Sequence, residues 1–145
     1  MRKYILLLVL SLSLTAMAQS GLKVSKLFDG KYAKQSDAVV AYITGEALGG
    51  YNLTLYRSIS LTCDATDAAE IEKWVVSDGA KAIDKETVLR GGSLRYGFFV
   101  LQPRSVNRYL FFVGKEADKG SGKRKITVVY IEGEASQEQI KKLIK

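Results

Sequence analysis

The sequence predicts an α+β domain with an antiparallel sheet of about five strands and with helices packed mainly on one face. Segments rich in β-branched and aromatic residues recur along the chain and are separated by glycine-containing turns. Other segments repeat apolar residues every three or four positions, which is typical of amphipathic helices. The last three predicted strands follow one another in hairpin order. Together these patterns favour one α+β layer arrangement.

The first 18 residues resemble a secretory signal peptide. Residues 1–3 are basic at two positions, residues 4–14 are apolar at most positions, and Ala16 and Ala18 are small residues at the −3 and −1 positions. We therefore expect cleavage after Ala18 and a single domain over residues 19–145. The apolar run is shorter than the roughly 20 residues that span a bilayer. The pattern predicts an exported protein, periplasmic, surface-bound or secreted, with no membrane segment after cleavage.

The first half of this domain contains three predicted elements. Residues 22–34 have apolar positions at helical spacing and predict a short helix, whereas residues 39–44 are β-branched and apolar and predict a strand. Residues 53–62 alternate, so we expect a strand with one buried face and one wetter face. The buried face would carry Leu53, Leu55, Ile59 and Leu61.

A helix is predicted after Cys63, where the apolar period changes to about 3.6 residues. Asp67 is the expected N-cap, with Glu70 three residues later. Gly79 is expected in the left-handed conformation beyond the helix end. Trp74 falls on the inward stripe and is interpreted as a core anchor.

Three strands are predicted over residues 94–101, 108–113 and 126–131. Apolar residues occupy both alternating sets in each of them, which is typical of strands covered on both faces. Either the N-terminal segment wraps the second face and completes an intramolecular core, or a second molecule covers that face. Residues 136–145 predict a short C-terminal helix that begins with a Ser136–Gln139 capping box and docks on the sheet through Ile140, Leu143 and Ile144.

The basic glycine-containing segment at residues 119–125 (KGSGKRK) is predicted to be a turn. A phosphate-binding loop needs a glycine at position 117 and Ser or Thr at position 124, but the chain has Ala117 and Arg124 there. A strand rather than a helix follows. The lysines therefore keep a loop tip in water.

The composition excludes several chemistries. The chain has no histidine, which removes Ser-His-Asp and Cys-His catalysis and most transition-metal sites. Cys63 is the only cysteine, so no internal disulfide exists, and we interpret it as buried filler. The closely spaced acid pairs lack a calcium-loop pattern and are interpreted as surface charge; they are Glu70/Glu72, Asp64/Asp67, Glu132/Glu134 and Glu116/Asp118. No cofactor or metal site is predicted. Nucleic acid is not an expected partner, because the net charge of +7 is modest and charges of both signs are interspersed along the chain.

Residues 128–136 leading into residues 140–144, together with the earlier segment 74–79, resemble small exported domains of unknown function found in Bacteroidota. The junction between Ala18 and Gln19 is in keeping with exported proteins of that phylum. The resemblance implies an α+β fold and a cell-envelope setting. It transfers no catalytic residue.

The leading functional hypothesis is a non-enzymatic envelope module that binds a protein partner, or itself, through an apolar sheet face, in adhesion or signalling. The alternative is a module that binds a glycan or an anionic ligand with surface tyrosine and arginine side chains. The candidate surface for the alternative comprises Tyr56, Arg57, Arg95, Tyr96, Arg104, Arg108 and Tyr109, with Tyr51 as a further aromatic. An enzyme that uses lysine, tyrosine or carboxylates is the third hypothesis.

Overall fold

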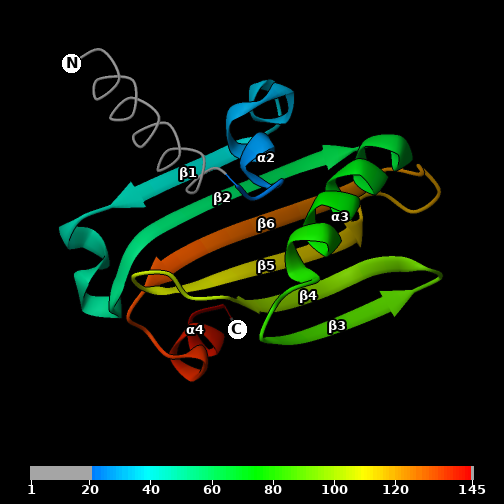
Figure 1. Ribbon diagram of the computed structural model, residues 1–145. Helices are drawn as coiled ribbons and strands as arrows, with labels where there is room; N and C mark the ends of the chain where they lie inside the picture. Colours follow the sequence, from blue (N-terminus) through cyan, green and yellow to red (C-terminus); the bar gives the residue numbers. More distant parts are fainter. Residues whose placement is uncertain (1–20, 145) are drawn as a thin grey trace, which may run out of the picture.

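The computed structural model describes residues 21–144, so the predicted signal peptide lies outside the described residues. It contains a six-stranded antiparallel sheet in the order β1-β2-β6-β5-β4-β3 (Figure 1). The strands are β1 (Val39–Thr44), β2 (Leu53–Cys63), β3 (Asp84–Arg90), β4 (Ser93–Leu101), β5 (Asn107–Glu116) and β6 (Arg124–Gly133). The predicted α+β class with an antiparallel sheet is confirmed. Strand β3 is additional to the predicted strands.

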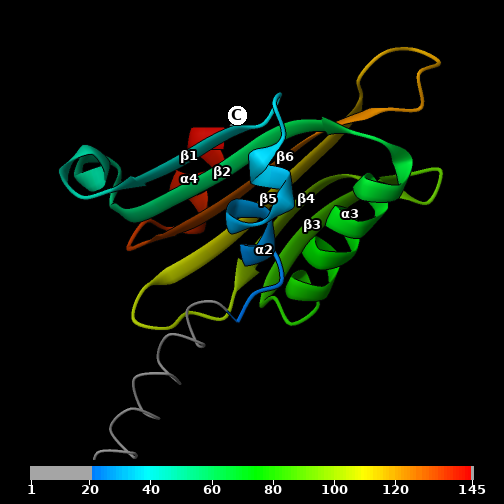
Figure 2. The same cartoon turned by 90° about the horizontal axis from the view of Figure 1, so that it is seen from above.

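Helices cover both faces of the sheet, and the two faces are unequal (Figure 2). Helix α2 (Ser25–Asp29), the 3-10 helix η1 (Lys31–Lys34) and helix α3 (Ala65–Gly79) lie on one face, here called the α3 face. The short C-terminal helix α4 (Gln137–Ile144) lies on the opposite α4 face. A second 3-10 helix, η2 (Glu46–Tyr51), connects β1 to β2.

Each face of the sheet has its own apolar core, because the central strands carry apolar side chains in both alternating sets. On the α3 face, Ile71 and Val75 of α3 pack with Phe112, Ile126 and Val128 of the sheet. The second core, on the α4 face, is smaller. It is formed by Leu48, Leu53, Phe98, Val100, Tyr109, Val129, Ile131, Ala135 and Ile140. The predicted docking of the C-terminal helix is confirmed for the buried Ile140, and Ile144 packs against the same core. Leu143 is 44% exposed, so the prediction that it docks on the sheet is wrong. The N-terminal segment lies on the α3 face, so the expectation that it could cover the second face is also wrong.

Both ends of helix α3 differ from the prediction. The N-cap is Asp64, whose carboxylate accepts the backbone N–H of Asp67 at 2.8 Å, so the expected cap at Asp67 is wrong by one turn. Gly79 is the last helical residue and does not have a positive φ. A side chain at this position would collide with the ring of Phe99. Close packing, not left-handed geometry, explains the glycine.

Strand β2 changes face near its start. A bulge between Leu53 and Leu55 places Leu53 in the core of the α4 face, whereas Ile59 and Leu61 remain in the core of the α3 face. The prediction that Leu53 shares a face with these residues is therefore wrong. The 39–44 strand is found as predicted. The 22–34 segment is helical as α2 and η1, with a break at Gly30.

The segment between β5 and β6 is a turn, as predicted. Gly120 and Gly122 have φ values of 83° and 72°, a conformation that other residues rarely adopt. The capping box of α4 is also confirmed, because the Ser136 hydroxyl and the Gln139 side chain each accept a backbone N–H from the other residue. Within residues 21–144, no helix has the length and apolar character needed to cross a bilayer.

Candidate binding surfaces

The α4 face is only partly covered, and the uncovered part is an apolar groove of about 450 Å³. Helix α4 lies against one side of the groove and η2 against the other, so the floor between them is sheet. We call this feature the α4-face groove. Its lining side chains are predominantly apolar or aromatic: Ile43, Leu48, Tyr51, Leu53, Tyr56, Phe111, Thr127, Val129, Ile131, Leu143 and Ile144.

The groove exists because α4 is short. An eight-residue helix extends about 12 Å, less than the length of the ten-residue strand β6 on which it packs. Ile140 is fully buried beneath the helix, whereas Leu143 is exposed at the groove wall. Tyr51, on η2, is 54% exposed. Water therefore reaches apolar surface that a longer helix would cover.

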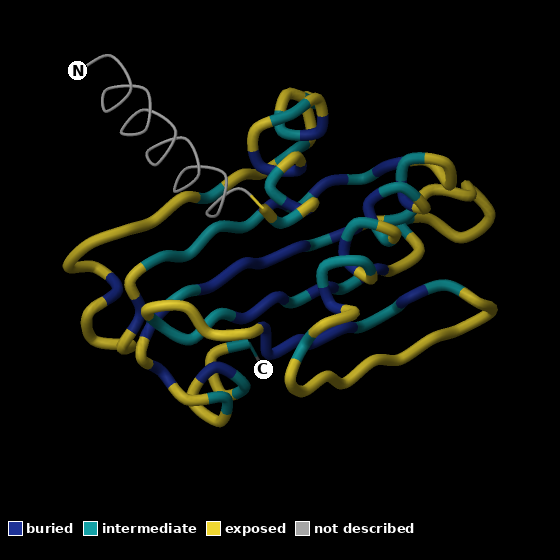
Figure 3. Tube along the Cα trace, in the orientation of Figure 1, coloured by how far each residue is buried: buried dark blue, intermediate teal, exposed yellow. Residues whose placement is uncertain are grey.

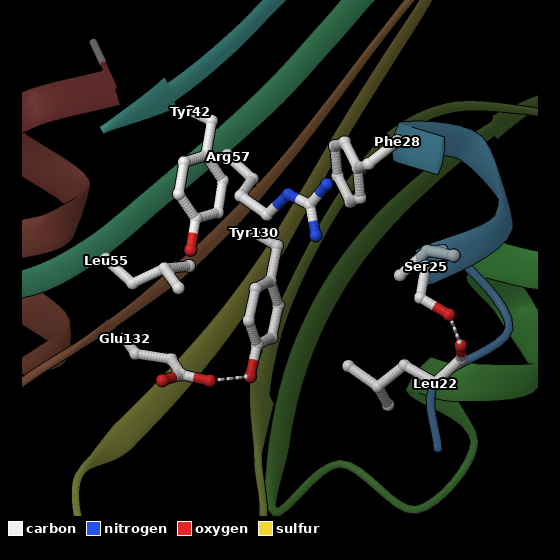
Figure 4. Close-up of a pocket in the computed structure, with 9 residues that line it drawn as sticks. Leu22, Ser25, Phe28, Tyr42, Leu55, Arg57, Tyr130 and Glu132 are labelled. Atoms are coloured by element: carbon white, nitrogen blue, oxygen red, sulfur yellow. Dashed lines mark hydrogen bonds between the residues drawn. The ribbon is translucent and has the colours of Figure 1, made fainter. Parts of the chain in front are cut away.

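The α3 face carries a second, smaller hollow of about 280 Å³, which we call the Arg57 hollow. Phe28 of α2 and Tyr42 of β1 flank the Arg57 guanidinium, each with its ring centroid 4.9 Å from Cζ (Figure 4). Tyr42 and Arg57 are direct cross-strand partners, which places the two side chains together. Nη2 of Arg57 donates to the Asp29 carboxylate at 2.8 Å.

The Nε atom of Arg57 is buried and has no hydrogen-bond partner within the described residues. Across the hollow, the Tyr130 hydroxyl donates to Oε2 of Glu132 at 2.5 Å (Figure 4). Burial and the neighbouring Glu132 carboxylate raise the pKa of Tyr130, so its hydroxyl stays protonated as a donor. The hollow thus combines a cation, a carboxylate and aromatic walls.

The predicted tyrosine and arginine residues fall on both sides of the sheet. Tyr56 lines the α4-face groove, and Tyr96 packs edge-on against Phe111 on the same face. Tyr109 is buried there and its hydroxyl donates to the Ala135 carbonyl at 2.6 Å.

The arginines are also separated. Arg57 lies in the hollow, and Nε of Arg108 donates to the Gln102 carbonyl at 2.9 Å. Arg95 pairs with Glu116 at 3.8 Å, and Arg104 is exposed in the loop between β4 and β5. The structure therefore brings Tyr56 and Tyr51 together in the groove, and it gives Arg57 a different set of neighbours.

Two other predicted groups have structural roles. Cys63 is a free buried thiol, in agreement with its interpretation as filler. Glu72, expected on the surface, is mostly buried: it binds Arg124 at 3.2 Å and accepts the backbone N–H of Leu94 at 2.5 Å. The surface interpretation of Glu72 is therefore wrong. No cluster of three or more metal-binding side chains occurs in the described part of the chain.

Comparison with known protein families gives a match to the sequence. The model of a family of unknown function, DUF6108, matches residues 11–144. The chain belongs to the DUF6108 family. No curated protein and no solved structure shows a significant match. The family description assigns no activity to a DUF6108 domain.

Sequence reasoning missed several residues of both surfaces in this DUF6108 domain. Phe28, Tyr42 and Glu132 line the hollow, and Ile43 and Leu143 line the groove. The exposed apolar residues of β1 were a usable signal, because the predicted strand 39–44 has no polar face. The helix α2, which brings Phe28 to Arg57, packs by long-range contacts that residue spacing does not encode.

Proposed function

We propose that the protein is an exported cell-envelope module, acting in adhesion or signalling, that binds the apolar side chains of a protein partner in the α4-face groove and catalyses no reaction. The observation that carries this proposal is the open apolar floor between η2 and α4. Exposed apolar patches rimmed by polar residues are typical of protein interaction sites. Thr127 adds a polar side chain to the lining, and the exposed Lys142 follows in α4 directly before the groove-lining Leu143.

Site-specific photo-crosslinking in the cell envelope tests this proposal. A photoreactive phenylalanine analogue replaces Tyr51 in the groove, and a control replaces Val76 on the outer side of α3; the native residues are 54% and 49% exposed. We expect a discrete protein adduct from position 51 and none from position 76. A second substitution, Ile43→Lys, places a charge at the groove wall and should abolish the adduct. No adduct at position 51, or the same adduct from both positions, would contradict the proposal.

Export itself is tested by the mass of the mature protein. We expect the envelope fraction to contain a chain that begins at Gln19, and Ala18→Arg should block the cleavage because the −1 position requires a small residue. A chain that retains Met1 and stays in the cytosol would overturn the export proposal.

A second candidate function is binding of an anionic sugar in the Arg57 hollow. The partly exposed Arg57 guanidinium, which lines the hollow, and the nearby Glu132 carboxylate favour it, because a sugar acid offers a carboxylate to the first and hydroxyls to the second. Glucuronate should raise the melting temperature, glucose should not, and Arg57→Met should remove the effect. Equal responses to both sugars would reject this candidate.

A further inference from the structure

Strand β1 is an open edge of the sheet. It pairs with β2 on one side, and no backbone hydrogen bond from the rest of residues 21–144 reaches its other side. Figure 3 shows β1 exposed along most of its length, in contrast to the buried central strands. Its free N–H and C=O groups form a template on which another strand can pair.

The other edge strand, β3, is built differently. All seven of its residues are exposed, but four of them are charged: Asp84, Lys85, Glu86 and Arg90. Charges on an edge strand oppose pairing with another chain. Strand β1 has the sequence VVAYIT and contains no charge, proline or glycine. The chain therefore protects one edge of its sheet against pairing and leaves the other unprotected.

The side chains of β1 make this edge self-complementary. In the register with β2, Val40 and Tyr42 lie on the α3 face, because their partners Ile59 and Arg57 belong to that side. Val39, Ala41 and Ile43 alternate with them and lie on the α4 face. A strand that pairs with β1 needs apolar side chains on both faces, and β1 itself has them.

We propose that two copies of the chain pair through β1, antiparallel and in register about a two-fold axis at Ala41. This register places Val40 opposite Tyr42 of the second copy on the α3 face, and Val39 opposite Ile43 on the α4 face. Aromatic–β-branched and β-branched pairs of this kind stabilise antiparallel strands. The result is a twelve-stranded sheet made of two six-stranded halves.

This pairing goes beyond the proposed function and does not depend on what occupies the groove. Because Ile43 belongs both to β1 and to the groove wall, the pairing brings the grooves of the two copies to adjacent positions on one continuous face. Pairing along the edge adds no further cover to either face of the sheet, so the groove of each copy stays open.

Disulfide trapping tests the pairing and its register. In the proposed dimer, position 41 faces itself across the axis at the distance of directly opposite residues, about 4.5–5.5 Å between Cα atoms, which a disulfide can bridge. Ala41→Cys should form a covalent dimer under mild oxidation. Thr87→Cys, at the centre of the charged edge strand, and the parent chain with its buried Cys63 should stay monomeric on a non-reducing gel.

Light scattering after size-exclusion chromatography supplies the second measurement. The purified parent should have twice the mass of one chain at micromolar concentration. Tyr42→Lys should give a monomer, whereas the matched control Val88→Lys should remain dimeric; the native side chains are 60% and 55% exposed, so neither change opens a cavity. A monomeric parent, dissociation by both variants, or equal crosslinking at positions 41 and 87 would overturn the proposal. Loss of the crosslink at position 51 with the dimer intact would instead count only against the proposed partner binding.

Discussion

The charge pair Glu72–Arg124 ties helix α3 to two strands at a position with little water. The two side chains are 17% and 11% exposed. Nη2 of Arg124 donates to the Leu94 carbonyl at 2.7 Å, and the Leu94 N–H donates to Glu72, so both side chains also satisfy backbone groups of β4. A buried pair of this kind is costly to break because removal of one partner leaves the other charge uncompensated.

We predict that Glu72→Ala lowers the free energy of unfolding by about 3 kcal/mol, since both the ion pair and the hydrogen bond to Leu94 are lost. The matched control is Glu116→Ala. Glu116 pairs with Arg95 at 3.8 Å but is 68% exposed, so its removal should cost at most about 1 kcal/mol. Urea denaturation of both variants measures the difference. Equal losses would show that burial does not govern the strength of these pairs.

The thiol of Cys63 is predicted to be unreactive in the folded protein. Burial at the end of β2, together with the nearby Asp67 carboxylate, raises the pKa of this thiol to about 11. At pH 8 the thiolate is therefore rare, and it is also inaccessible. A thiol reagent at pH 8 should label Cys63 only after urea is added, whereas Ser121→Cys in the exposed β5–β6 turn should be labelled at once. Rapid labelling of the folded parent chain would refute this.

At the scale of elements, the start of α3 depends on one carboxylate. Asp64 accepts the backbone N–H of Asp67, an otherwise unpaired donor of the first helical turn. We predict that Asp64→Ala lowers the free energy of unfolding by about 1 kcal/mol and that Asp64→Asn, which keeps the acceptor, lowers it by a few tenths. Thermal or urea denaturation tests both. An equal effect of the two variants would mean that charge, not the cap, matters at this position.

Local patterns predicted the elements better than their boundaries. The alternation in residues 53–62 and the helical period after Cys63 gave a strand and a helix where the structure has β2 and α3. Two acids three residues apart, Asp64 and Asp67, can each be an N-cap, and only the packing of α3 decides between them. The role of Gly79 could not be predicted either, because it depends on close packing against Phe99 of β4, and neighbouring residues in the sequence do not report that contact.

Strand β3 escaped prediction for a different reason. All seven of its residues are exposed, and its sequence DKETVLR lacks alternation between apolar and polar residues. Backbone pairing with β4 holds it, together with polar contacts to α4. Gln137 donates to Asp84 at 2.8 Å, and Lys141 pairs with Glu86. None of these contacts requires an alternation of apolar and polar side chains. An edge strand of this kind carries too weak a periodic signal to be found from sequence.

The candidate surfaces were predicted only as residue types. Arg57 was named from the sequence, and the structure gives it a hollow; Phe28 and Asp29, which hold it, come from a helix almost thirty residues earlier. The apolar residues on both alternating sets of β5 and β6 predicted a second covered face. Helix α4 covers only part of this second face because the helix is short. The buried Ile140 fixes the position of the helix on the sheet.

For the whole molecule, the two-faced core places several ionisable side chains where water is scarce. Burial makes the largest contribution to raising the pKa values of Cys63, Tyr32 and Tyr130 above their ordinary values, and neighbouring carboxylates raise these pKa values further. The folded chain therefore holds protons that the unfolded chain releases. The stability from these groups is fully present below their unfolded pKa values, 9.0 for the thiol and 10.0 for the phenols, and is lost as the pH rises.

We predict that the free energy of unfolding falls steadily from pH 9 towards pH 12. The slope reports the protons released on unfolding, about one for each group within its window. Tyr32 is the sharpest test, because its hydroxyl donates to Glu70 at 2.7 Å and more weakly to Asp67 at 3.3 Å. Tyr32→Phe should be less stable than the parent at pH 7 but should have a shallower slope above pH 10, so that the two stability curves converge at high pH. Tyr51→Phe, which changes an exposed ring, should follow the parent curve. Urea titrations from pH 7 to 12 measure all three curves, and parallel curves for Tyr32→Phe and the parent would show that the buried phenol does not set the alkaline limit of this fold.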